Sequence, residues 1–502
     1  MITKNLRPPV SATLLSPPPR SAKLALRRHF RPPAGQHVFM SKEARQTMTP
    51  LSDLERIFDA ALTRIDPYKM IVDHVRLQGS RLSVAFEDQR HEVDLTDFDR
   101  ILVLGAGKAS ARMARAFEDI LGDRISEGLV SVKYGHGEPL SHVRVMEAGH
   151  PAPDENGVEA ARAMVELARG LTGRTLVLNL VSGGGSALLP CPLVHDDGAD
   201  SVRLTLSDKQ RMTAALFASG ADIGEINCVR KHISGVKGGR LLQLMAPATS
   251  LNFILSDVVG DRLDTIASGL TSHDETTFAQ ALGIVEKYGL EKDAPEAVMR
   301  ALRLGAEGRL PETAKKGDPA TMLATNILIG SNQAALLAAC DTARGLGYNV
   351  AALTCGLTGE SREAAKFFYG IASDVRKSGL LVKKPACVIA GGETVVTLRG
   401  QGKGGRNQEM ALAFLAEMAR DELKGRDIHF LSASTDGTDG PTDAAGAFAS
   451  REVLGEAEAA GLSIDAALRA NDSYHFFERI GRLLKTGPTM TNVCDLHMLV
   501  VA

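Results

Sequence analysis

Apolar runs and amphipathic stretches alternate along most of the chain, and this alternation predicts strands and helices in turn. Residues 100–108 and 175–189 each begin with a run of Val, Ile and Leu with little polar alternation and end in a glycine turn or loop. Such runs are typical of strands buried on both faces of a parallel sheet. Residues 109–121 and 156–171 space their apolar side chains along one face of a helix. The pattern predicts an α/β fold with a doubly wound, mostly parallel sheet. Further strands are expected over residues 128–137, 251–261, 326–332, 349–355, 386–400, 428–437 and 496–501, and further helices over 53–66 and 207–220.

A polar segment with Gly and Pro, residues 308–321, interrupts this pattern and is expected to be a linker. A chain of 502 residues is too long for one ordinary core. We therefore expect two domains, over residues 49–307 and 322–502.

The first 48 residues differ from the rest of the chain. They contain no Asp or Glu as far as Ser41, and many Arg, Lys and Pro residues. This composition is typical of a disordered tail outside the fold. Two alternatives stay open: a start assigned too early, with Met40 as the true first residue, and a transit peptide.

Composition narrows the function classes. The net charge of −2 provides no basic field for nucleic acid or anionic lipid, and no apolar run approaches the roughly 20 residues that a bilayer requires. Six cysteines are scattered without a C-x-x-C pair or zinc-ligand spacing, as expected in a reducing compartment. We expect a cytoplasmic protein that binds small molecules and neither nucleic acid nor membranes. No pattern indicates its oligomeric state.

The loops that follow the predicted strands are rich in Gly, Ser, Thr and Asp, and ligands of doubly wound folds bind beyond the carboxyl ends of strands. Residues 181–189 place three glycines between two serines, which exposes backbone amides as an anion cradle; the alternative is a tight packing turn. The cationic stretch 228–241 includes Arg230 and Lys231; the alternative is a solvated helix face.

The turn over residues 105–110, G-A-G-K-A-S, differs from G-x-G-x-x-G because Ser110 replaces the third glycine and Lys108 lies inside the turn. Backbone amides and a helix N-terminus already attract anions, and the lysine adds a positive charge. The residues expected to bind the cofactor are Gly105, Gly107, Ser182, Gly183, Gly184, Gly185 and Ser186.

Asp257 and Asp436 follow predicted strands directly. Such acids can hold Mg²⁺ together with waters, and the alternative is that they are turn formers. Cations, glycine loops and acids together form the inventory of phosphoryl transfer. The chain has neither the G-x-x-x-x-G-K-[ST] motif nor the H-R-D and D-F-G motifs of protein kinases.

Eight motifs follow one another along the chain: GAGKAS, GHPAPDENG, LVSGGGSALL, VRKHISGVKGG, LSDVVGDRLDTIASG, GGETVVTLRGQGKGGRNQE, STDGTDGPTDAAG and GPTMTNVCDL. In this order they resemble the glycerate 2-kinases that end in a MOFRL domain, from about Leu51 to the C-terminus. The resemblance implies ATP- and Mg²⁺-dependent phosphorylation of D-glycerate to 2-phosphoglycerate. It also implies a Rossmann-like N-terminal domain, a C-terminal α/β MOFRL domain and an active site in the cleft between them.

The resemblance implies that Lys108 and Arg406 are the catalytic cations. The residues expected to bind substrate are Arg230, Lys231, Glu393 and Asn407. Asp257 and Asp436 are expected to bind metal or act as base, and the sequence does not separate these roles. Met490 and Cys494 stand where the family pattern has Gly and Asn, which alters details of one loop and leaves the class unchanged.

The main alternative is an NAD(P)H-dependent hydroxypyruvate reductase, a name that family members also carry. The strand, glycine turn and helix around residues 103–110 favour it. The absent third glycine counts against it, as does Lys133 near the end of the second strand, where an acid would hold a ribose. A non-enzymatic sugar-phosphate sensor is a third possibility, but it gives no reason for so many acids and cations at strand ends.

Overall fold

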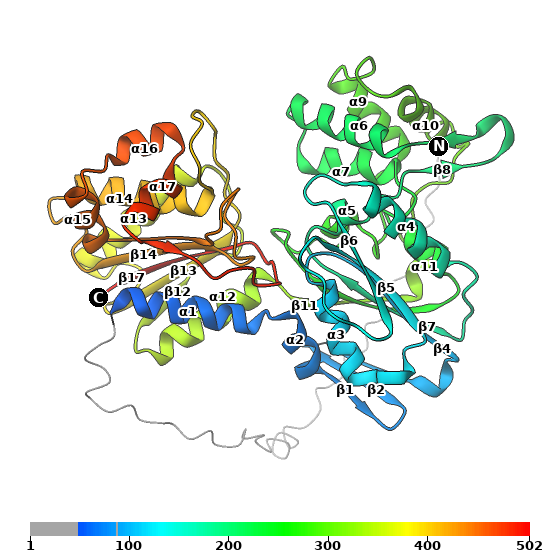
Figure 1. Cartoon of the computed structure of the whole chain (residues 1–502), viewed down its shortest axis with the longest axis horizontal. Coiled ribbons are helices and arrows are strands. Elements are labelled where there is room, and N and C mark those ends of the chain that lie inside the picture. The colour runs from blue at the N-terminus through cyan, green and yellow to red at the C-terminus, as the bar shows by residue number, and fades with distance from the viewer. Residues whose placement is uncertain (1–48, 87–88) are drawn as a thin grey trace, which may run out of the picture. The chain divides into compact units, whose positions relative to one another are not determined.

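Two six-stranded sheets organise the protein in the computed structural model, which describes residues 49–86 and 89–502 (Figure 1). The basic extension expected over residues 1–48 lies outside the described residues. Residues 49–502 form one compact unit that contains both sheets.

The first sheet is entirely parallel, as predicted. Its strand order is β11 (Ala324–Gly330), β10 (Thr249–Leu255), β7 (Thr175–Val181), β4 (Arg100–Ala106), β5 (Glu127–Lys133) and β6 (Val143–Ala148). The chain builds outward from β4 through β5 to β6, and then returns to the other side of β4 with β7. The carboxyl ends of β4 and β7 therefore lie side by side where the strand order reverses, which is where ligands of such sheets bind.

Helices cover both faces of this sheet (Figure 1). On one face, α2 (Pro67–His74) and α3 (Ser110–Leu121) pack with Val103 and its neighbours; the rings of Phe117 and Phe253 meet edge-on at 4.8 Å. On the other face, α4 (Glu155–Ala168) and α8 (Arg240–Met245) pack with Leu104. Adjacent residues of β4 thus enter different cores, which explains why the strand shows no polar alternation.

Four further helices form a separate apolar cluster beside the first sheet. They are α6 (Leu206–Ser219), α7 (Ile223–His232), α9 (Phe278–Lys287) and α10 (Glu296–Ala306). Met212, Val229 and Phe278 lie at its centre and are fully buried. This cluster fixes the positions of α6 and α7, whose cations line a cavity described below.

The second sheet is mixed, whereas the sequence predicted mostly parallel strands. Its order is β12 (Asn349–Ala352), β13 (Ala386–Gly392), β17 (Asp495–Val501), β14 (Ile428–Ser434), β15 (Gly446–Ser450) and β16 (Leu483–Leu484). The last strand, β17, is antiparallel to both β13 and β14. The carboxyl ends of β13 and β14 therefore share an edge with the first residue of β17.

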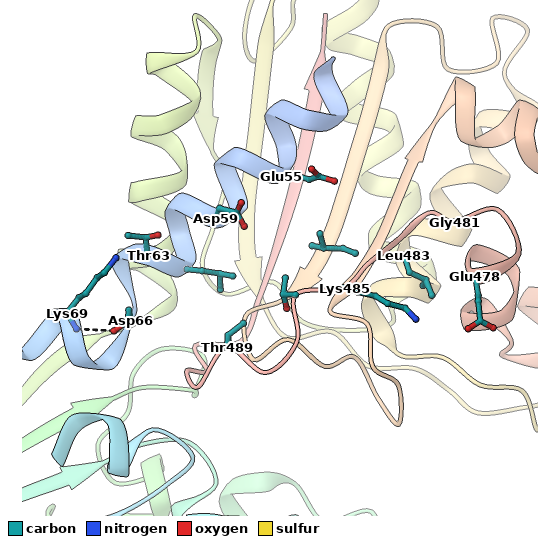
Figure 2. A pocket seen from close by; sticks show the side chains of 13 residues that line it. Glu55, Asp59, Thr63, Asp66, Lys69, Glu478, Gly481, Leu483, Lys485 and Thr489 are labelled. Carbon is teal, nitrogen blue, oxygen red and sulfur yellow. Dashed lines mark hydrogen bonds between the residues drawn. The ribbon is translucent and has the colours of Figure 1, made fainter. Parts of the chain in front are cut away.

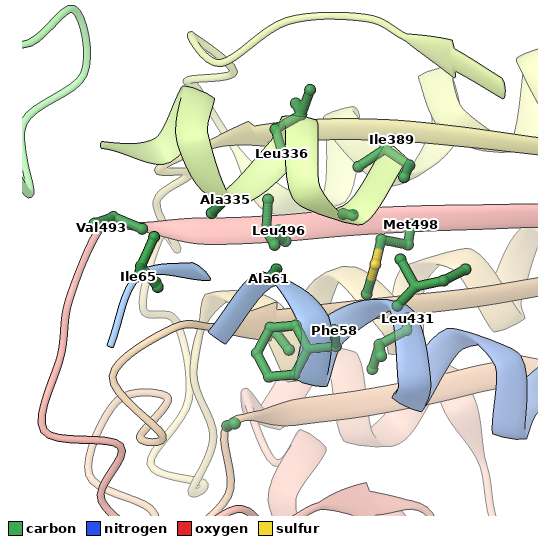
Figure 3. Close-up of a cluster of buried hydrophobic side chains, with 14 of the residues drawn as sticks. Phe58, Ala61, Ile65, Ala335, Leu336, Ile389, Leu431, Val493, Leu496 and Met498 are labelled. Atoms are coloured by element: carbon green, nitrogen blue, oxygen red, sulfur yellow. The ribbon is translucent and has the colours of Figure 1, made fainter. Parts of the chain in front are cut away.

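The first described helix, α1 (Pro50–Arg64), packs on the second sheet with α12 (Asn332–Gly345). Figure 3 shows Phe58 and Ala61 against Leu431 and Met498 of the sheet. The opposite face carries α13 (Ser361–Ser378) and α14 (Arg406–Arg420), and Phe414 stacks on Phe430 at 4.3 Å.

The two sheets do not follow the domain boundary expected over residues 308–321. Each sheet contains or is covered by one element from the other side of that boundary. The strand β11 falls within the expected C-terminal domain but joins the first sheet, and α1 falls within the expected N-terminal domain but covers the second. The remaining elements are β1 (Val75–Gln78), β2 (Arg81–Phe86), β3 (Gln89–Asp94), α5 (Gly185–Leu188), β8 (Val194–His195), β9 (Val202–Arg203), α11 (Pro319–Met322), α15 (Arg451–Ala459), α16 (Ile464–Ala470) and α17 (Ser473–Arg479).

Candidate active site

The turn after β4 is locked to the loop after β7. Gly107 has φ +145°, and an added Cβ would lie 2.1 Å from the Ser182 hydroxyl, so only glycine fits. The backbone N–H of Lys108 donates to the carbonyl of Gly183 at 2.9 Å. Ser110, which replaces the third glycine, donates its hydroxyl to the Leu180 carbonyl at 2.8 Å and is fully buried. The serine thus anchors the helix, while Lys108 emerges at the point where the strand order reverses.

Lys108 forms an ion pair with Asp436, at the end of β14 in the other sheet. Its Nζ lies 2.9 Å from Oδ2 of Asp436. The second oxygen, Oδ1, accepts three hydrogen bonds of 3.0 Å, from the Ser434 hydroxyl and from the backbone and hydroxyl of Thr438. Burial acts to raise the pKa of Asp436, but Lys108 and Thr438 together lower it below its usual value. The carboxylate therefore stays ionised and holds Lys108 in place.

Asp257, just beyond β10, lies on the other side of the glycine loop. A Cβ on Gly183 would come within 2.4 Å of its Oδ2, so the carboxylate rests on the bare backbone. Burial raises the pKa of Asp257 to about 6; the charge of Lys108 opposes this rise and that of Glu393 adds to it. A carboxylate whose pKa lies near the working pH is well suited to accept a proton.

Arg406 begins α14 and is held by two acids. Its Nε and Nη2 donate to the two oxygens of Asp495 at 2.5 and 2.8 Å, and its Nη1 lies 2.8 Å from Oε1 of Glu393. Asp495 is fully buried at the start of β17. Burial acts against the charge of Arg406, but Asp495 and Glu393 outweigh it and raise the pKa of Arg406. The guanidinium is thus a fixed cation, partly exposed on the side where a ligand can reach it.

Asp439 fixes the start of α14 from a neighbouring loop. Its two oxygens accept the backbone N–H groups of Asn407 and Gln408 at 3.1 and 2.8 Å. The side chain of Asn407 is fully buried, and its Oδ1 accepts the Ser432 hydroxyl at 2.6 Å. Asn407 therefore supports the helix that carries Arg406, and the structure does not expose it to a substrate as the sequence predicted.

Two neighbouring cations on α7 face different surroundings. Arg230 donates to the Ser186 hydroxyl at 2.6 Å and lines a cavity of about 630 Å³ beside the glycine loop. Lys231 is buried and lies 3.2 Å from Asp274 and 3.5 Å from Asp264. The prediction that Lys231 binds substrate conflicts with this placement, because two carboxylates already neutralise its charge.

Of the residues predicted to bind the cofactor, some line the cavity and others are buried in contacts within the protein. Gly184 and Ser186 line the cavity. Gly105 is buried within β4, where an added Cβ would meet the Leu180 carbonyl at 2.6 Å, and Gly185 packs equally closely on Ala106. The buried Ser182 hydroxyl accepts the backbone N–H of Ala109 at 3.0 Å. For Gly105, Ser182 and Gly185, the structure indicates packing and helix-capping roles instead of ligand contact.

Another cavity, of about 830 Å³, lies between the first two helices and residues 478–489. Figure 2 shows Glu55, Asp59, Asp66 and Glu478 around it, with Lys69 and Lys485. None of the predicted site residues lines it. Its acids alone indicate no ligand, so the candidate active site remains the cluster around Lys108.

Known proteins resemble this chain over nearly its whole length. The model of a domain of unknown function, DUF4147, matches residues 53–303, and that of the MOFRL family matches residues 386–495. D-glycerate 2-kinase of Thermotoga maritima is 41% identical over 86% of this chain and 98% of its own length. The chain belongs to the glycerate 2-kinase family.

Other members support the same placement. The crystal structure of glycerate kinase from Thermotoga maritima superimposes with a TM-score of 0.75 at 38% identity, covering 90% of this chain and 99% of that chain. A relative from Agrobacterium vitis, 39% identical over 89% of this chain and 94% of its own length, carries the provisional name hydroxypyruvate reductase. The mixed α/β architecture with a fully parallel first sheet is therefore that of the glycerate 2-kinase family.

Within this family member, the described residues show two further features. No helix among them combines the length and apolar character needed to cross a membrane. No group of three or more His, Cys, Asp or Glu side chains in this part of the chain is arranged to hold a metal ion.

Several residues around the site were not among those expected to act in it. Asp495 is part of the C-terminal family motif over residues 487–496, but nothing local marks it as the partner of Arg406. Lys209, Lys237 and His150 line the cavity with Arg230. Lys237 belongs to the cationic stretch 228–241 and His150 to the family motif over residues 149–157, whereas Lys209 lies in an ordinary amphipathic helix and carries no local signal.

Proposed function

We propose that this protein transfers the terminal phosphoryl group of ATP to the 2-hydroxyl of D-glycerate, giving 2-phosphoglycerate and ADP. The ion pair between Lys108 and Asp436 is the observation that carries the proposal. It joins the loop of one sheet to the loop of the other, beside Asp257 and close to the Arg406 group. The names of the relatives point to the same reaction.

We infer two domains of different roles, over residues 49–307 and 322–502, with α1 and β11 each joining the sheet of the other domain. Counted from β4, the first sheet has the strand order 3-2-1-4-5-6, which is that of Rossmann-like nucleotide-binding sheets. The second domain is the MOFRL domain. We infer that substrates meet in a cleft between them, where Lys108 and Arg406 approach from opposite domains and closure would exclude water.

Lys108 acts on the transferring phosphoryl group. Phosphoryl transfer depends mostly on positioning and on neutralising charge in the transition state. An ammonium group at the end of β4 supplies a point charge there, and Asp436 keeps it oriented before the substrates bind. Asp436 is a poor base because its pKa is low.

Asp257 accepts the proton of the 2-hydroxyl. Its raised pKa of about 6 leaves it ionised at neutral pH and still able to take up a proton. The high pKa of an alcohol makes such a base necessary as the oxygen attacks phosphorus. As the 2-oxygen bonds to the γ-phosphorus, the bond from that phosphorus to the β,γ-bridging oxygen breaks and ADP leaves, while the hydroxyl proton passes to Asp257.

Arg406 binds an oxyanion of the substrate. A planar guanidinium matches the two oxygens of a carboxylate or phosphate. Asp495 fixes its plane, while Glu393 occupies its Nη1. Glu393 is partly exposed. It lies beside the guanidinium of Arg406, which is expected to hold the carboxylate or the hydroxyls of glycerate.

The residues present fit Mg²⁺. Asp257 and Asp436 are carboxylates close enough to Lys108 for its charge to lower the pKa of each. Mg²⁺ in such sites uses one or two carboxylates and takes its other ligands from waters and phosphates. When bound, the ion would neutralise phosphate charge. With Asp257 assigned to proton transfer, Oδ2 of Asp436 is the carboxylate atom that would hold it, together with waters and phosphate oxygens.

The reductase alternative is favoured by the name of the Agrobacterium vitis relative. A dinucleotide site of this sheet type places an acid at the end of the second strand to hold the ribose. Here β5 ends in Lys133, which cannot accept that hydrogen bond and would suit only the 2′-phosphate of NADPH. The six cysteines are all free, which agrees with the cytoplasmic location proposed for either enzyme.

One comparison of two reactions tests the proposal. The purified protein is given D-glycerate with Mg–ATP and followed for ADP; in parallel, it is given hydroxypyruvate with NADH or NADPH and followed for cofactor oxidation. We expect turnover only in the first reaction. Oxidation of the nicotinamide cofactor without ADP formation would establish the reductase instead.

A further inference from the structure

Three cations gather in one cavity without an acidic partner. Lys209 of α6, Arg230 of α7 and Lys237 before α8 line the cavity of about 630 Å³ beside the glycine loop. Lys209 and Lys237 are buried, and Arg230 is partly buried. Among the ion pairs of the described residues, none includes any of the three.

The contacts of these cations are all with neutral oxygens. Arg230 donates to the Ser186 hydroxyl at 2.6 Å, and Lys237 donates to the hydroxyl and carbonyl of Ser186 at 3.0 and 2.9 Å. Lys209 donates to the Ile233 carbonyl at 3.0 Å. Ser186 therefore holds two cations close together at the inner wall of the cavity.

This arrangement is costly without a ligand, because buried charges are stable only when they are paired. Burial, together with the charge of Arg230, lowers the pKa of Lys209 to about 7. Burial and the charges of Arg230 and Lys209 lower the pKa of Lys237 well below its usual value. Lys231, one residue from Arg230, shows the contrast, since it has two carboxylate partners. The walls of the cavity therefore carry basic groups that no carboxylate neutralises, and a bound anion would neutralise them.

The outer part of the same cavity is apolar. Pro151, Pro153, Ala214 and Phe217 line it, and Phe217 is 61% exposed at the surface of α6. An aromatic ring and prolines around a concave site can hold a flat heterocycle. The cavity therefore offers cations at one place and an apolar wall at another.

The cavity also adjoins Lys108. His150 lines it and packs on Gly184, where an added Cβ would lie 2.9 Å from the ring. The preceding residue, Gly183, accepts the backbone N–H of Lys108 at 2.9 Å. Phosphates that extend from the three cations along the glycine loop would lead to Lys108, the proposed catalytic lysine.

We propose that this cavity binds the nucleoside triphosphate, with the base against Phe217 and the phosphates on Arg230, Lys209 and Lys237. The inference rests on the proposed function for the identity of the donor. Charge decides between the two substrates: a triphosphate carries several negative charges, whereas D-glycerate carries one. Arg230, expected from the sequence to bind substrate, is thereby assigned to the nucleotide.

Calorimetric binding of ADP and of inorganic triphosphate tests the assignment without turnover. We expect Arg230→Gln and Lys237→Met to weaken both ligands at least about tenfold, the effect of losing one charged hydrogen bond. Phe217→Ser should weaken ADP and leave triphosphate unchanged. Arg211→Met is the matched control, since Arg211 lies exposed on α6 outside the cavity, and its affinities should match the parent. Unchanged ADP affinity in both cation variants, with melting temperatures preserved, would overturn the proposal.

A measurement on the unaltered protein covers the case in which these variants fail to fold. Photolysis with 8-azido-ADP should label the peptide that contains Thr213 to Phe217. Label on residues 393–398 instead would place the nucleotide beside Arg406, where another cavity lies, and would contradict the proposal.

Steady-state kinetics separate this inference from the proposed function. The cation variants should raise KM for ATP and leave KM for D-glycerate unchanged; the reverse pattern would assign the cavity to the acid substrate. A protein that binds ADP at this cavity but does not phosphorylate D-glycerate would refute the proposed function and leave the nucleotide site standing.

Discussion

In the proposed mechanism, Lys108 is the residue on which phosphoryl transfer depends most. If it stabilises the transferring phosphoryl group, Lys108→Met should lower kcat by about 100-fold or more, with a smaller effect on KM for ATP. If it only neutralises bound nucleotide, KM for ATP should rise while kcat stays the same. Steady-state assays with D-glycerate distinguish these outcomes.

Two controls accompany this variant. Lys366→Met removes an exposed lysine paired only with Glu363 of its own helix, and it should be fully active. Lys108→Met also leaves the carboxylate of Asp436 without its partner, so its melting temperature should fall. Adding Asp436→Asn removes that second charge and should recover stability without recovering activity. Full activity in Lys108→Met would end the proposed role.

Asp257 should set the acid side of the pH profile. Because its pKa is raised to about 6, it is ionised above that pH and protonated below it. We expect kcat/KM for D-glycerate to fall about tenfold for each pH unit below 6. His150, whose pKa burial and the charge of Lys108 lower to about 4, stays neutral over this range. Asp257→Asn should be inactive at every pH, and an acid limb near 4 would contradict the assignment.

At the scale of elements, the support of α14 is a separate source of stability. Asp439 accepts two backbone N–H groups at the first turn of this helix. Asp439→Ala leaves them buried without a partner, so the free energy of unfolding should fall by about 1–3 kcal/mol. Asp443→Ala in the same loop removes an exposed acid and should change stability far less. Denaturant unfolding compares the two, and equal effects would show that the cap contributes little.

Helices and strands were predictable from the sequence where one local pattern is enough to identify them. The strand β4, the turn with Lys108 and the helix α3 follow from an apolar run, glycines and helical spacing. The antiparallel direction of β17 does not follow from its sequence, because a fully buried strand has the same composition in either direction. The strand β6 was not predicted, since Val143–Ala148 mixes buried and exposed residues.

The residues of the site were likewise predictable only where a local sequence pattern marks them. Lys108, Asp257 and Arg406 stand in recognisable loops, so sequence motifs find them. Asp495 and Lys209 act through partners distant in sequence, 89 residues away for Asp495 and Arg406. Lys231 was expected to bind substrate as a cation that could meet its carboxylate, and Asn407 because it lies in the motif that carries Arg406. Their side chains are instead buried among protein partners that only the fold supplies.

At the scale of the whole molecule, the exchange of segments makes a truncation test. The helix α1 covers Leu431 and Met498 of the second sheet. Removing residues 1–39 should leave the melting temperature and the kinase activity unchanged, because the composition of this segment is unsuited to a core. Removing residues 1–65 should expose that apolar face and give insoluble or unfolded protein. Loss of activity in the shorter deletion would refute the expectation.

The position of the phosphate on the product tests the central claim most directly. Proton-coupled ³¹P NMR of the reaction with D-glycerate and Mg–ATP distinguishes the two monophosphates, because the phosphorus couples to one proton at carbon 2 and to two at carbon 3. We predict growth of a phosphomonoester doublet, from 2-phosphoglycerate, in step with ADP. A triplet, or an ATP spectrum that does not change, would contradict transfer to the 2-hydroxyl.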